Sequence, residues 1–72
     1  MTASEVIEEM DGFALKHGRL PSRIHASTES RRAILEWLVD DAQPVLLHKG
    51  GFLFNGVAVF HDPVIVGIVM FE

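Results

Sequence analysis

The sequence of 72 residues contains no cysteine. This absence excludes a disulfide framework and a thiolate metal site, and it fits a protein of a reducing compartment. The sequence also lacks internal repeats, low-complexity runs and linkers, so we expect residues 1–72 to form a single domain. So short a chain buries only about 60% of the surface that its unfolded form exposes, which makes association a natural source of added stability.

No hydrophobic run is long enough to read as a membrane span. Residues 52–72 are almost all apolar, but Asn55-Gly56 and His61-Asp62-Pro63 interrupt them. Asp62 at the bilayer centre would cost roughly 2.5–3.5 kcal/mol, and Pro63 would break a helix there. The first residues have neither the positive nor the apolar segment of a secretory signal, so we expect a cytoplasmic protein with no membrane partner.

Motifs for catalysis and for metal binding are also missing. The four histidines, His17, His25, His48 and His61, do not have the spacing of a zinc site. No nucleophile elbow surrounds a serine, and Gly50-Gly51 precedes a strand-like segment instead of the helix that a phosphate-binding loop requires. We therefore expect no enzymatic activity, no metal and no cofactor.

Charge is distributed unevenly along the chain, whose net charge is −4. Residues 16–32 form a basic island in which Lys16, Arg19, Arg23, Arg31 and Arg32 face Glu29 alone. Arg19, Arg23, Arg31 and Arg32 are candidate contacts for an anion or an acidic partner, close to the free N–H groups of a predicted helix N-terminus. The pI of about 5.4 and the absence of aromatic residues between Phe13 and Trp37 argue against nucleic acid as the partner.

Two amphipathic helices are predicted. Thr2 and Glu5 have the spacing of a capping box, apolar residues then recur every three or four positions, and Gly18 marks the end of the first helix. Ser27 or Thr28 begins the second helix, which extends to about Val39.

Strands are predicted around the second helix and after it. Residues 23–26 form a short strand, and residues 45–54 form either a hairpin or a loop that leads into one strand. Asn55-Gly56 is a hairpin turn or a bulge, of which we favour the bulge, and 64–71 is the last strand. The sequence thus predicts a two-layer α+β fold, in the order α-β-α-β-β-β, with two helices on a mainly antiparallel sheet of three or four strands.

The last predicted strand is apolar on both of its faces. If both helices cover one face of the sheet, the other face stays open; a helix on each face would instead cover both. We place the open apolar face at Phe60, Val64, Val66, Ile68 and Met70. The opposite set of side chains, with Val69 and Phe71, is the alternative.

Residues 23–27, 31–38 and 53–59, followed by the closing apolar strand, resemble small proteins encoded by tailed phages and prophages. The same segments are similar to the strand, helix and hairpin part of tailed-phage major capsid proteins. The chain departs from that pattern at Ala58, where proline is usual, and it lacks the long spine helix and extended loop of a capsid shell. The resemblance concerns packing positions and assigns no functional residue.

Two functional hypotheses follow. The first is a small non-enzymatic phage-type protein, located in the cytoplasm of the host cell, that acts through protein–protein association. Its apolar sheet face would bind another copy in a homo-oligomer such as a homodimer, or a host or virion component. The second is an inhibitor-type binder that uses the basic island on an acidic protein surface or nucleic acid.

Overall fold

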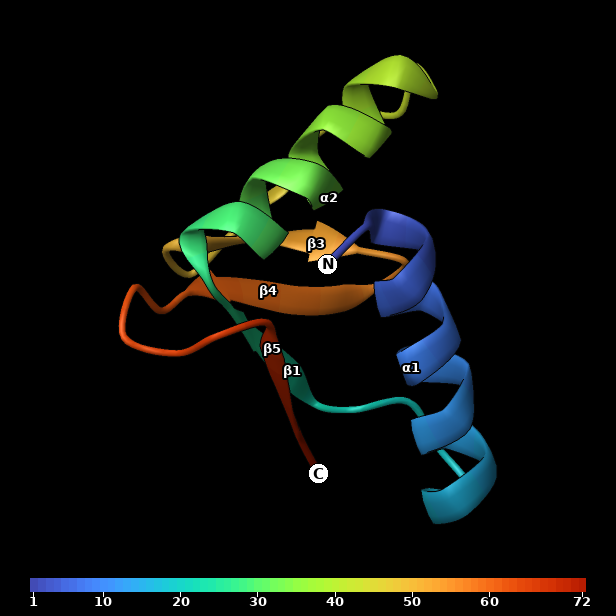
Figure 1. Ribbon diagram of the computed structural model, residues 1–72. Helices are drawn as coiled ribbons and strands as arrows, with labels where there is room; N and C mark the ends of the chain where they lie inside the picture. Colours follow the sequence, from blue (N-terminus) through green and yellow to red (C-terminus); the bar gives the residue numbers. More distant parts are fainter.

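The computed structural model describes all 72 residues and confirms an α+β fold with two helices and five strands (Figure 1). The elements in chain order are α1 (Ala3–His17), β1 (Arg23–Ala26), α2 (Thr28–Asp40), β2 (Leu47–His48), β3 (Gly51–Phe54), β4 (Val57–His61) and β5 (Ile68–Phe71). The order is therefore α-β-α-β-β-β-β, with one strand more than the predicted order, because residues 47–54 form two strands and not one.

The strands form one mixed sheet in the order β2-β3-β4-β1-β5. The first strand of the chain, β1, lies between the last two, parallel to β4 and antiparallel to β5. The connection from β4 to β5 must therefore pass the end of β1 and cover two strand spacings, about 10 Å. Residues 62–67 form this connection, so the last strand begins at Ile68 and the predicted strand over 64–71 is too long.

Two tight turns connect β2, β3 and β4. Asn55 and Gly56 have φ values of 50° and 80°, and β3 and β4 pair directly on either side of them. Positive φ at both central residues is the signature of the hairpin turn that matches the twist of its strands, so the favoured bulge is wrong. Lys49 and Gly50, with φ values of 48° and 87°, connect β2 and β3 in the same way.

Local capping signals define both helices. At α1 the Thr2 hydroxyl accepts from the Glu5 backbone N–H at 3.2 Å, and the Thr2 backbone N–H donates to the Glu5 carboxylate at 3.1 Å. Gly18 ends this helix in the left-handed conformation. At α2 the Ser27 hydroxyl accepts from the backbone N–H of Ser30 at 3.2 Å. The predicted caps are confirmed.

Both helices pack on the same face of the sheet, where one core cluster joins them to the strands (Figure 1). The cluster comprises Val6 and Met10 of α1, Ile34 and Leu38 of α2, and Ile24, Ala26, Phe52, Phe54, Val57 and Val59 of the strands. Trp37 packs edge-on against Phe54, with ring centroids 5.6 Å apart. The fold thus has two layers, and the alternative with a helix on each face is wrong.

Candidate interaction surface on the open face of the sheet

The face of the sheet that points away from the helices has no second layer over it. Strand residues that alternate with the core residues have their side chains on this face. We define the open face as Arg23, His25, His48, Leu53, Ala58, Phe60, Val69 and Phe71. All but Ala58 remain exposed or half-buried. The surface is therefore mostly apolar, with one arginine and two histidines in it.

His25 lies at the centre of an aromatic cluster on this face. Its ring is edge-on to Phe60, with centroids 6.1 Å apart, and lies 4.6 Å from the centroid of Phe71. The guanidinium carbon of Arg23 lies 4.0 Å from the Phe71 centroid, within the range of a cation–π contact. Side chains from β1, β4 and β5 thus hold one another in place at the surface.

The two ring nitrogens of His25 face groups of opposite charge. Arg23 Nε donates to Nε2 at 3.4 Å, and an Asp62 carboxylate oxygen lies 3.6 Å from Nδ1. Because arginine can only donate, Nε2 must accept, and the neutral ring carries its proton on Nδ1, toward Asp62. The imidazole therefore separates a positive side chain from a negative one.

Gly51 allows β3 to lie close to β4 beneath the ring of Phe60. A Cβ atom at Gly51 would lie 2.2 Å from the carbonyl oxygen of Val59 and 2.9 Å from Cδ1 of Phe60. No side chain fits at this position, so the Phe60 ring can lie over the bare backbone of β3. The absence of a side chain thus shapes one part of the open face.

Ile68 and Met70, predicted to lie on the open face, lie on the opposite one. Ile68 pairs with Ala26 and Met70 with Ile24, and those two residues of β1 are fully buried under the helices. Side chains that pair directly across two strands share a face, so Ile68 and Met70 pack against the core. Their placement on the open face was wrong, and the alternative set of side chains in β5 is the open one.

The other three predicted interface residues have different surroundings. Phe60 lies on the open face and is half-buried. Val64 and Val66 lie in the connection between β4 and β5, outside any strand, with 88% and 96% of their surfaces exposed. These two valines are therefore exposed apolar residues of a loop and do not continue the sheet surface.

The arginines of the basic island do not gather at one place. Arg23 lies on the open face, whereas Arg31 and Arg32 are exposed on α2, which covers the opposite face. Arg19 lies in the connection between α1 and β1. No arginine or lysine forms a salt bridge with a carboxylate. A clamp that uses all four arginines at once is not formed by this fold.

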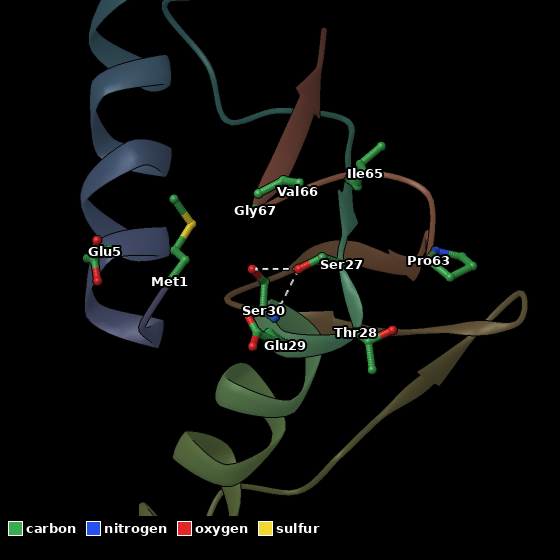
Figure 2. Close-up of a pocket in the computed structure, with 10 residues that line it drawn as sticks. All are labelled: Met1, Glu5, Ser27, Thr28, Glu29, Ser30, Pro63, Ile65, Val66 and Gly67. Atoms are coloured by element: carbon green, nitrogen blue, oxygen red, sulfur yellow. Dashed lines mark hydrogen bonds between the residues drawn. The ribbon is translucent and has the colours of Figure 1, made fainter.

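A shallow hollow of about 490 Å³ lies between the N-terminus of α2, the start of α1 and the connection from β4 to β5 (Figure 2). Two carboxylates, of Glu5 and Glu29, are among the residues that line it. The pKa of Glu5 lies below its ordinary value because the backbone and side chain of Thr2 hydrogen-bond to it. The hollow therefore carries negative charge, which opposes the binding of an anion at this helix N-terminus.

Other polar contacts are isolated pairs. Thr28 Oγ1 and His61 Nε2 lie 2.8 Å apart, and His17 Nδ1 lies 2.6 Å from a carboxylate oxygen of Glu72. No group of three or more histidine, aspartate or glutamate side chains is arranged to hold a metal ion. Neither helix is long and apolar enough to cross a membrane.

The contact between the aromatic side chains and Arg23 is not evident in the sequence. His25 lies far from Val69 and Phe71 in the chain, and only the pairing of β1 with β5 brings them together. The available signal was the alternation in residues 23–26, where apolar Ile24 and Ala26 predict the buried face and leave Arg23 and His25 on the other.

No protein-family model matches this sequence, and neither a curated protein nor a solved structure is significantly similar to it.

Proposed function

We propose that this chain is a small non-enzymatic protein that acts by protein–protein association through the open face of its sheet. The observation that carries the proposal is the single layer of helices, which leaves Leu53, Phe60, Val69 and Phe71 without cover. Contiguous exposed apolar side chains on a small domain are typical of interaction sites. The sheet also holds them rigidly, which lowers the entropy lost on binding.

The energy of burial sets the expected affinity. Complete burial of a large apolar side chain is worth roughly 1.5–3 kcal/mol, and these side chains are already partly covered. Their remaining gain is of the same order as the lower estimates for the cost of association, about 4 kcal/mol. We therefore propose weak or moderate association, which a measurement must follow over a wide range of protein concentration.

The resemblance to small tailed-phage proteins suggests the setting of this activity. We propose a phage-type protein of the host-cell cytoplasm whose partner is another copy of itself or a host or virion component. The exposed Val69 and the half-buried Phe60 and Phe71 supply apolar contact in either case.

A second candidate rests on the contact between Arg23 and Phe71. A cation beside aromatic rings on an open sheet is an arrangement that can stack the bases of single-stranded nucleic acid. The carboxylate of Asp62 beside His25 and the net charge of −4 oppose a polyanion, so protein association is the better supported function.

The experiment that tests the proposal compares three chains by light scattering over a concentration series. Val69→Asp puts a charge into the open face, where 41% of Val69 is exposed. Val64→Asp puts the same charge on an exposed valine of the loop and serves as the matched control. We expect the wild type and Val64→Asp to associate with equal affinity and Val69→Asp to stay monomeric.

Two results would contradict the proposal. If the wild type associates and Val69→Asp does so with the same affinity, association uses a different surface. If Val64→Asp is the variant that loses association, the loop and not the open face is the interface. Circular dichroism of both variants checks that each chain keeps its fold.

A further inference from the structure

The charged side chains of Arg23 and Asp62 lie on either side of His25 along the strand direction. Arg23 begins β1, whereas Asp62 directly follows β4, the parallel neighbour of β1. Ala26 pairs with His61, so the backbone of Asp62 lies four residue levels beyond that of Arg23, about 13 Å along the strands, and the two side chains approach each other toward His25. His25 lies between them, in contact with both.

This distribution of charge is the one that a two-fold symmetric interface requires. In an isologous dimer every group of one copy meets a group of the other across the axis, so a self-complementary patch needs opposite charges on opposite sides of that axis. Arg23 and Asp62 are placed in this way about His25. The apolar side chains of Phe60 and Val69 pair with His25 on either side and occupy the same central level.

We propose that the occupant of the open face is a second copy of this chain, an inference that rests on the proposed function. The two sheets pack face to face about a two-fold axis that runs across the strands at the level of His25. This axis reverses the strand direction between the copies, so Arg23 of each copy meets Asp62 of the other. An axis along the strands would instead bring like charges together.

The same charges discriminate between occupants. A single-stranded nucleic acid would place phosphates against Asp62 as well as against Arg23, whereas a second copy pairs each charge with its opposite. Rotation about the proposed axis places the cation of one copy against the anion of the other, with the two imidazole rings between them. We therefore favour a second copy over a polyanion.

Charge exchange between copies tests the arrangement. Arg23→Glu replaces two attractions by two repulsions in a homodimer, and Asp62→Lys does the same with the opposite sign. We expect each variant alone to have a dimer dissociation constant at least about tenfold above that of the wild type at low salt. A mixture of the two variants should form heterodimers, because the introduced glutamate of one copy then meets the introduced lysine of the other. The unchanged Arg23 and Asp62 of the two copies meet at the second contact.

Mass spectrometry under non-denaturing conditions distinguishes the heterodimer from both homodimers by mass. Because Asp62 also accepts from the backbone N–H of Val64 at 3.1 Å, Asp62→Lys could disturb the connection between β4 and β5. Replacement of Asp62 by asparagine removes the charge but keeps an oxygen that can accept from the backbone N–H of Val64. The double variant Arg23→Glu/Asp62→Asn should therefore dimerise better than Arg23→Glu alone, whatever the fate of Asp62→Lys.

The results separate this inference from the proposed function. If Val69→Asp abolishes the dimer but the charge variants dimerise like the wild type, or their mixture forms no heterodimer, the open face associates in another orientation and the inference is wrong. If the wild type is monomeric at millimolar concentration, the second copy is excluded. A monomer that binds a single-stranded oligonucleotide in a salt-dependent manner would assign the face to nucleic acid and overturn both proposals.

Discussion

Replacement of Gly51 by alanine tests how closely β3 and β4 approach. The new Cβ atom would lie 2.2 Å from the carbonyl oxygen of Val59. Contacts between carbon and oxygen in sheets are about 3.3 Å or longer, so β3 must move away by roughly 1 Å. The obstacle is backbone in the middle of the sheet and cannot rotate aside as a flexible side chain could.

The expected cost is at the upper end of that for overpacked sites, about 2–3 kcal/mol of unfolding free energy. For a domain of this size, this corresponds to a fall in the thermal midpoint of roughly 10–20 °C, measured by circular dichroism. Gly50→Ala is the matched control, because a Cβ there meets nothing within 4 Å and only the φ of +87° is strained. We expect Gly50→Ala to cost about 1 kcal/mol.

The result that would refute this reasoning is a Gly51→Ala protein that unfolds at or above the midpoint of Gly50→Ala. In that case β3 would not lie against Val59 as the structure has it. Removal of the Phe60 ring by Phe60→Ala should not rescue Gly51→Ala, because the shorter contact is with the backbone and not with the ring.

Three further changes test other parts of the fold. Phe54→Ala removes a fully buried ring from the core, and chemical denaturation should show a loss of about 3–5 kcal/mol. Gly12→Ala, at an exposed position inside α1 where a Cβ meets nothing, should raise the unfolding free energy by up to about 1 kcal/mol. Glu5→Ala removes a carboxylate whose pKa is lowered in the folded state by its hydrogen bonds to Thr2. The wild-type carboxylate stabilises the folded state at pH values above its ordinary pKa of 4.5, and this stabilisation is lost as the pH falls through the lowered pKa of the folded state. The thermal midpoints of the wild type and the variant should therefore converge in acid.

Features set by neighbouring residues could be predicted from the sequence. The capping box of Thr2 and Glu5 and the terminal Gly18 depend only on local backbone geometry, and both are present. Asn55-Gly56 carried an equally local signal for a hairpin turn, and it was misinterpreted as a bulge although both residues tolerate positive φ. The tolerance of both residues for positive φ is the local signal that indicates this turn.

Features set by strand pairing could not be predicted in the same way. Residues 64–71 are apolar at every alternate position on both faces, so a period of two does not show which set is buried. The choice depends on the partner strand, and β5 pairs with β1 instead of with its sequence neighbour β4. Long-range pairing of this kind leaves no local trace in the sequence.

The strand β1 nevertheless decides the character of the open face. Ile24 and Ala26 must be buried because they are the apolar half of a four-residue strand that lies between β4 and β5, and this puts Arg23 and His25 on the other side. The neighbours on that side, Phe60, Val69 and Phe71, are therefore held against a cation and an imidazole, and not against further aliphatic side chains. A purely apolar face would slide over its partner in many registers, whereas charges fixed on either side of His25 favour one. The polar half of β1 is thus the feature on which the specificity of the proposed interface depends.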